Sequence, residues 1–210
     1  MGLIENPILT PSKLHNLILY IVSYCGRELG AIELAKMIYL IDLENVRLSG
    51  KTMTGDNYTR QERGPLCANF GDCITQMDGF ELNVSIENNS SSSFPKHTHT
   101  LGKKPRFEPI LNQVDLVIIQ RVLKRLNGLR PKQLEELAYE SEPMRAITDQ
   151  EKKIGKLLLR EKIDFSFVRP NPVLLKWREN MAKEQSPDKD FEAFLLQERK
   201  EIKELLVSLG

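Results

Sequence analysis

The hydrophobic and polar positions between residues 34 and 48 repeat with the period of an α-helix. Apolar side chains recur at three- and four-residue steps, which predicts an amphipathic helix with one buried face. The predicted stripe consists of Leu34, Met37, Ile38, Ile41, Asn45 and Leu48, in which Asn45 is the polar exception. Ser49-Gly50 should end this helix, because glycine readily adopts the left-handed conformation of the residue that follows a helix.

A polar turn is predicted after this helix. Gly55 suits the turn, and Tyr58 falls in a short segment that we expect to be extended. Arg63-Gly64-Pro65 is then predicted to open a second helix, because the first turn of a helix does not need the amide that proline lacks. That helix would present one broad apolar face, made of Leu66, Phe70, Cys73, Ile74 and Met77.

The remaining patterns predict further helices around one hairpin. Thr10-Pro11 is predicted to start a first helix. Residues 80–86 alternate between apolar and polar as a half-buried strand does, and residues 98–107 are the candidate return strand. Asn112 and Arg130-Pro131 are predicted to start two more helices. The expected fold is mainly α, a helical core domain with a small β-hairpin insertion at about residues 80–107 and a C-terminal helical extension.

A proline-rich boundary near Pro170 and Pro172 divides the predicted domain, residues 1–168, from the extension, residues 169–210. The extension should hold two helices, which either dock on the domain or bind a partner. Its candidate partner-binding residues are aromatic, because aromatic side chains often dominate interfaces, and they are Trp177, Phe191 and Phe194.

Composition is ordinary for a water-soluble globular chain. Hydrophobic residues make up 40% and charged residues 28% of the sequence, and the formal net charge is +1. No bulk positive charge therefore favours nucleic acid as a partner. No apolar run approaches the length of a membrane span, and residues 1–11 lack the features of a signal peptide. We expect a cytoplasmic protein without a membrane partner.

The cysteines and histidines do not predict a metal site, and no cofactor is expected. Cys67 and Cys73 would lie on different faces of one predicted helix, so we expect them, like Cys25, to be reduced structural thiols. His97 and His99 would share one face of a strand, but no third ligand is spaced to join them. His15, which has no partner motif, is expected to be a surface or hydrogen-bonded histidine.

The polar residues of the central segment allow two interpretations. Tyr39 and Asp42 are three residues apart and should be neighbours beside the apolar stripe of their helix, as should Lys36. Arg63 and the amides after Gly64 are candidates to face them. Such a cluster either locks a loop to the helix or binds a polar group of a partner.

The order and spacing of these residues resemble the signature of the Panacea-domain family, the SocA-like antitoxins. The signature residues are Lys36, Met37, Ile38, Tyr39, Asp42, Gly50, Met53, Thr54, Gly55, Tyr58, Gly64, Pro65 and Leu66. The segment 139–146 resembles a later family motif, and the whole resemblance spans residues 11–166. It implies that Lys36, Tyr39, Asp42, Gly50, Thr54, Gly55, Tyr58, Gly64 and Pro65 are motif or partner-binding residues. Arg63 is added to these candidates because it could face Tyr39 and Asp42.

The resemblance also implies a function. Members of this family are antitoxins that bind and neutralise a toxin encoded beside them, and some deliver the toxin to a Clp-type protease. The chain would then act stoichiometrically and would not be an enzyme. Two other classes stay open on the residues alone, namely a small hydrolase built on Tyr39, Asp42 and Arg63, and a DNA-binding regulator.

The hydrolase and DNA-binding hypotheses each lack a supporting feature. No nucleophile and base can be paired in the sequence. The predicted helices after Asn112 and Arg130 have helix-turn-helix proportions, but the second carries Glu135, Glu136 and Glu140, whereas a DNA-reading helix usually carries several basic or amide side chains.

Overall fold

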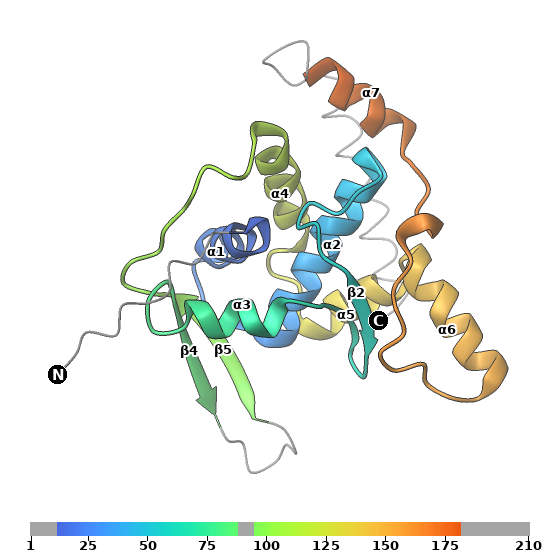
Figure 1. The fold of residues 1–210 in the computed structure, drawn as a ribbon, viewed down its shortest axis with the longest axis horizontal. Coiled ribbons are helices and arrows are strands. Elements are labelled where there is room, and N and C mark those ends of the chain that lie inside the picture. Colours follow the sequence, from blue (N-terminus) through green and yellow to red (C-terminus); the bar gives the residue numbers. More distant parts are fainter. Residues whose placement is uncertain (1–11, 88–94, 182–210) are drawn as a thin grey trace.

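Helix α2, Ala31–Ser49, forms the centre of the fold. The structure, a computed structural model, describes residues 12–87 and 95–181. Within these residues the chain is mainly α, with seven α-helices and two small antiparallel sheets, which confirms the predicted fold class (Figure 1). The other elements are α1 Lys13–Cys25, β1 Leu29–Gly30, β2 Tyr58–Gln61, β3 Gly64–Cys67, α3 Phe70–Met77, β4 Leu82–Glu87, β5 Lys96–Leu101, α4 Gln113–Leu126, α5 Pro131–Tyr139, α6 Glu142–Ile154, the 3-10 turn η1 Phe165–Phe167 and α7 Pro172–Met181.

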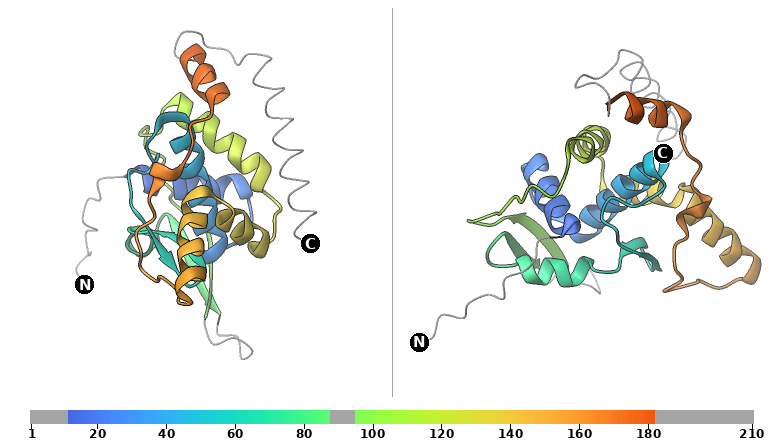
Figure 2. Two further views of the ribbon diagram at one scale, coloured as in Figure 1. Left: turned by 90° about the vertical axis from the view of Figure 1, so that its right-hand side faces the viewer. Right: turned by 45° about the horizontal axis from the view of Figure 1, so that its top comes forward.

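Helix α2 is enclosed on nearly all sides. Helices α1, α4, α5 and α7 and strand β3 pack around it, and 14 of its 19 residues are buried (Figure 2). The prediction of an amphipathic helix with one buried face was therefore too narrow, because side chains beside the predicted stripe are also interior. The predicted stop is confirmed: Gly50 is left-handed at φ 73°, and its amide donates to the carbonyl of Val46.

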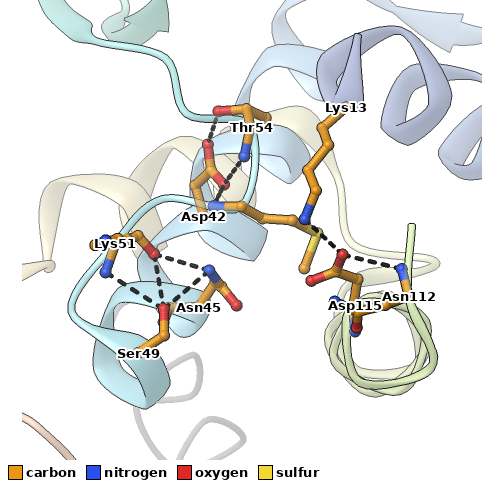
Figure 3. A network of polar contacts seen from close by, with 9 residues as sticks. Lys13, Asp42, Asn45, Ser49, Lys51, Thr54, Asn112 and Asp115 are labelled. Carbon is orange, nitrogen blue, oxygen red and sulfur yellow. Dashed lines mark hydrogen bonds and ion pairs between the residues drawn. The ribbon is translucent and has the colours of Figure 1, made fainter. Parts of the chain in front are cut away.

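Local start and stop signals were predicted well for α4 and α5. Asn112 caps α4 by accepting from the amide of Asp115, whose side chain accepts in return from the amide of Asn112. Lys13 of α1 also donates to Asp115, so the cap is tied to a second helix (Figure 3). Helix α5 begins at Pro131 as predicted. Helix α1 begins later than predicted, with Ser12 and not Thr10 as its cap.

Pro65 lies in a strand and does not open a helix. Strands β2 and β3 pair antiparallel around a two-residue turn, and Pro65 lies opposite Arg60. Gly64 has φ +87°, which is not a helical conformation, and the residue before a proline disfavours the helical region. The next helix, α3, begins only at Phe70. Cys67 and Cys73 therefore lie in different elements, although both are buried free thiols as expected. Cys25 is also free but only half-buried, so the expectation of a buried thiol was wrong there.

The chain after α6 continues the β2–β3 sheet. The amide of Arg60 donates to the carbonyl of Glu161, and the amide of Arg160 donates to the carbonyl of Arg60. The amide of Ile163 donates to the carbonyl of Tyr58 in the same way. This pairing holds residues 160–163 along the outer edge of β2.

The predicted hairpin is confirmed with shorter strands. Strands β4 and β5 pair antiparallel and project from the helical body, while Phe80 and Phe107 lie outside them (Figure 1). The two-residue strand β1 pairs with the other edge of β5, a contact that the sequence did not predict. His99 of β5 is buried, and its Nδ1 lies 3.0 Å from the carbonyl oxygen of Leu29.

The start of the C-terminal extension packs on the domain. The amide of Asn171 donates to the carbonyl of Arg47 in α2, and Trp177 of α7 is only 4% exposed within the core. The division at residue 168 stays a prediction. Phe191 and Phe194 lie outside the described residues, and the proposed partner contact of Trp177 stays a prediction for a side chain that is interior here.

No helix of the described ranges has the length and apolar character needed to cross a bilayer.

Replacing Trp177 tests whether α7 belongs to the core. Trp177→Ala should lower the free energy of unfolding by about 3 kcal/mol, because truncating a buried tryptophan loses apolar burial and leaves a cavity. Val173→Ala is the matched control on the same helix, where the side chain is 44% exposed. Urea unfolding of both variants measures the difference, and equal midpoints would show that α7 is not part of the core.

Candidate functional site

The signature residues of α2 are interior side chains with polar ends. Lys36 is 3% exposed, and Tyr39 and Asp42 are fully buried. A buried polar group that has no partner costs about 1–3 kcal/mol, so each of these ends has to meet another element of the fold. The partners of these residues therefore indicate what the signature does.

Asp42 holds the turn between α2 and β2. Its carboxylate accepts hydrogen bonds from the amides of Met53 and Thr54, at 2.5 and 3.0 Å, and from the hydroxyl of Thr54, which lies beside it in Figure 3. It also accepts from the hydroxyl of Tyr58 at 2.7 Å. Burial raises the pKa of the Asp42 carboxyl, and the hydrogen bonds from Thr54 and Tyr58 act in the opposite direction. Two carboxylate oxygens offer about four acceptor positions, so these four donors occupy the group. Asp42 thus has no free lone pair with which to act as a base.

Gly50, Gly55 and Asn45 complete the same turn. Gly50 and Gly55 have φ values of 73° and 76°, a region that residues with a Cβ rarely adopt. Asn45 donates to the carbonyl of Lys51 at 2.8 Å and to the hydroxyl of Ser49 (Figure 3). The polar exception in the predicted stripe therefore closes the chain back on the end of α2.

Tyr39 and Tyr58 form an aromatic cluster with Phe165. The Tyr39 and Tyr58 rings meet edge to face at 5.4 Å, and Phe165 of η1 lies 5.5 Å from Tyr58. The Tyr39 hydroxyl lies 2.6 Å from the hydroxyl of Ser141, the residue before α6. Burial raises the pKa of Tyr39 well above its usual value, so the phenol stays protonated. The cluster joins α2 to β2, α6 and η1.

Lys36 fixes the turn into β3. Its ammonium donates to the carbonyl of Pro65 at 2.8 Å, and burial lowers its pKa from 10.5 to about 8. A Cβ on Gly64 would lie 3.3 Å from the ring of Tyr139 and 3.4 Å from Nζ of Lys36. The motif glycine is therefore required both by its backbone angle and by the space that Lys36 and Tyr139 occupy.

Arg63 does not join this cluster. It is exposed in the turn between β2 and β3, so the prediction that it faces Tyr39 and Asp42 was wrong. Arg60 is the buried arginine instead. It forms an ion pair with Glu151 of α6, with its Nε 3.0 Å from the carboxylate, and its guanidinium lies 5.2 Å from the ring centre of Tyr139. The alternation that buries Tyr58 also buries Arg60 two residues later, and this signal could have identified it.

Further contacts of buried charged or polar side chains were not predicted from the sequence. Glu44 of α2 lies 2.8 Å from Arg121 of α4, with both side chains at most 3% exposed. His15 lies 2.6 Å from Glu81, which also pairs with Arg106. His15 is therefore an interior, partnered histidine and not a surface one.

The arrangement favours the interpretation that these residues lock loops to α2, and it disfavours a reactive site open to solvent. The polar ends of Lys36, Tyr39 and Asp42 meet groups of the same chain inside the core. Within residues 12–87 and 95–181 there is no group of three or more His, Cys, Asp or Glu side chains that could hold a metal ion. A groove of about 760 Å³ lies over the end of α2, the turn around Gly50, Asp56 and Asn57, and residues 161–170.

Comparison with known protein families identifies a relationship. A family model described as "Antitoxin SocA-like, Panacea domain" matches residues 34–143, slightly more than half of the chain. The match runs from α2 into the first turn of α6 and contains the whole Lys36–Leu66 signature. It is narrower than the resemblance over residues 11–166 that the sequence suggested. No curated protein and no solved structure matches the chain.

Removing the acceptor at the centre of the turn should destabilise the fold. Asp42→Ala should lower the free energy of unfolding by about 3 kcal/mol or more, because two amides and two hydroxyls lose their partner, and Tyr58→Phe by about 1–2 kcal/mol. Asp149→Ala, which removes an exposed aspartate on α6, is the control and should cost less than about 0.5 kcal/mol. Urea unfolding measures all three, and similar losses for Asp42→Ala and Asp149→Ala would contradict the assignment.

The buried ammonium of Lys36 should make stability depend on alkaline pH. Between about pH 8 and 10.5 the unfolded chain binds a proton at this lysine that the folded chain does not, so folded wild type gains stability as pH rises. Relative to Lys36→Met, the gain should be on the order of 2 kcal/mol between about pH 7.5 and 10. Lys132→Met, at a side chain that is 85% exposed, should show no such gain. A constant difference between wild type and Lys36→Met across this range would refute the prediction.

Proposed function

Because the chain belongs to the SocA-like, Panacea-domain family of antitoxins, we propose that it neutralises a cognate toxin, encoded by a neighbouring gene, through direct stoichiometric binding. The observation that carries this proposal is the family match over α2 to α5, the part of the chain that holds the signature. The family name supports an antitoxin role in general. The identity of the partner and the stoichiometric mechanism are the proposed parts.

The interior position of the signature supports binding without bond chemistry. Asp42 is occupied by four donors, Tyr39 is paired with Ser141, and Lys36 is paired with Pro65. None of these polar ends is presented to a substrate. A hydrolase built on Tyr39, Asp42 and Arg63 is disfavoured further, because Arg63 lies in an exposed turn away from the other two.

A DNA-binding role for the α4–α5 pair is also disfavoured. Leu134 and Ala138 of α5 are buried, and α5 packs against α2, β3 and α6. Helix α5 and the residue after it carry three glutamates, Glu135, Glu136 and Glu140, which repel phosphate.

The interior signature leaves partner choice to other surfaces. We place part of it on the β4–β5 hairpin and the turn before it, where Ile86 and Phe80 are 61% and 54% exposed. The extension beyond Pro172 is the second candidate region. In this division of roles the signature maintains a scaffold shared by the family, while the surface selects the toxin.

Co-expression tests the proposed function. The product of the neighbouring gene, expressed from an inducible promoter, should arrest growth alone and should not do so when this chain is produced with it. Protection should saturate when the two proteins are equimolar, and the two should co-elute from a sizing column. Continued arrest at a large excess of this chain would overturn the proposal.

The same cells separate masking from delivery to a protease. Masking leaves the toxin level unchanged on an immunoblot, and we expect this result. A fall in toxin level that disappears in a host lacking Clp proteases would assign the adaptor mechanism instead. If this chain protects a host that lacks Clp proteases at amounts far below those of the toxin, catalytic turnover is indicated.

A further inference from the structure

The segment 152–162, at the end of α6 and in the chain that follows it, combines exposed aliphatic and basic side chains. Ile154, Leu157 and Leu159 are 57%, 53% and 44% exposed. Around them the same segment carries five basic residues and one acidic residue, in a chain whose net charge is only +1. The basic residues are Lys152, Lys153, Lys156, Arg160 and Lys162, all of them exposed.

Buried contacts fix the backbone of this segment. The carboxylate of Glu151 accepts from the amide of Leu158 at 2.9 Å, and the Glu151 carbonyl accepts from the amide of Lys156. Burial raises the pKa of Glu151, but hydrogen bonds from Arg60 and Leu158 lower it overall, so the group is an anion that holds the loop. At the far end, Arg160 has φ 67° and donates its amide to the carbonyl of Arg60 at 2.7 Å.

The anchoring turns aliphatic side chains outward. Leu158 packs against the core, whereas Leu157 and Leu159 on either side of it are exposed. Ile154, the last residue of α6, is exposed just before them. Helix α6 itself lies at the outer edge of the molecule (Figures 1 and 2). A held loop that exposes adjacent aliphatic side chains within a charged rim has the character of an interaction site.

We propose that the segment 152–162 is a docking surface for the toxin, and that the toxin meets it with an apolar patch rimmed by acidic side chains. This inference rests on the proposed antitoxin function. Charge complementarity identifies the acidic rim, because five basic side chains and one acidic side chain accompany the three aliphatic groups in the segment. One of the five, Lys152, also pairs with the exposed Asp149 at 3.4 Å. The exposed apolar side chains of the segment are aliphatic, whereas surfaces that bind single-stranded nucleic acid usually have aromatic side chains that stack on bases. A protein partner therefore fits the segment better than nucleic acid.

Two double variants test the surface in the co-expression experiment and in a binding titration with the purified product of the neighbouring gene. Leu157→Ser/Leu159→Ser should weaken binding at least about tenfold and abolish protection, because central apolar contacts dominate interfaces. Lys156→Glu/Lys162→Glu should weaken binding similarly and mainly through slower association, since it reverses the complementary charge. Neither should lower the melting temperature, because all four side chains are exposed.

Matched controls change the same chemistry elsewhere. Tyr24→Ser removes an exposed side chain from α1, and Lys124→Glu/Lys132→Glu reverses two exposed charges on α4 and α5. Both controls should bind within about twofold of wild type, as surface changes outside an interface usually do.

The outcomes separate this inference from the proposed function. If wild type binds the toxin and the segment variants bind equally well, the docking surface is wrong and the antitoxin function stands. If wild type neither binds nor protects, both fall together. Binding of wild type to duplex DNA or to vesicles containing phosphatidylserine, lost in Lys156→Glu/Lys162→Glu while toxin binding is kept, would assign the segment to an anionic ligand and overturn the inference.

Discussion

Helix α2 can lie inside the protein only because other elements supply a partner for each of its polar side chains. Lys36 meets β3, Asp42 meets the turn before β2, and Glu44 meets α4. Each partner that was missing would cost on the order of 1–3 kcal/mol, a large share of the 5–15 kcal/mol that stabilises an ordinary domain. The positions of these elements around α2 are therefore set by polar contacts as much as by apolar packing.

The sequence predicted the features whose causes are local. Asn112, Pro131 and Gly50 act on the backbone within a few residues, and each marks an element end where it was expected. Pro65 was misjudged because its conformation depends on pairing with Arg60 across a turn and on the distant Lys36.

The burial of the signature was equally hard to see. Lys36 and Asp42 are charged residues of the kind that usually face solvent. They are interior because elements that follow in the sequence cover α2. The same applies to Arg60, whose partner Glu151 is 91 residues away in the sequence. Composition and spacing identify such residues as a pattern, whereas their partners are defined by tertiary structure.

A series of contacts joins the interior signature to the exposed segment 152–162. The interior ion pair of Arg60 and Glu151 is linked on one side to Tyr139 and the β2–β3 turn, and on the other to the backbone of Leu158. A change in the interior would therefore alter how the 152–162 segment is displayed, although no residue of that segment is part of the motif. The signature is buried and the segment is exposed, but the Arg60–Glu151 pair links their positions.

The sequence distance between α2 and its partners has a consequence for synthesis on the ribosome. Tyr39 and the hydroxyl that it meets on Ser141 are 102 residues apart. At translation rates of 5–20 residues per second, the helix emerges roughly 5–20 s before that partner exists. The buried lysine, aspartate and glutamate of the helix stay hydrated until their own partners emerge, at Pro65, at residues 53–58 and at Arg121, and until then the nascent chain is open to proteases. The fold can be completed only when α6 and α7 have emerged. Synthesis of this last part of the described chain therefore limits how soon each new molecule can act.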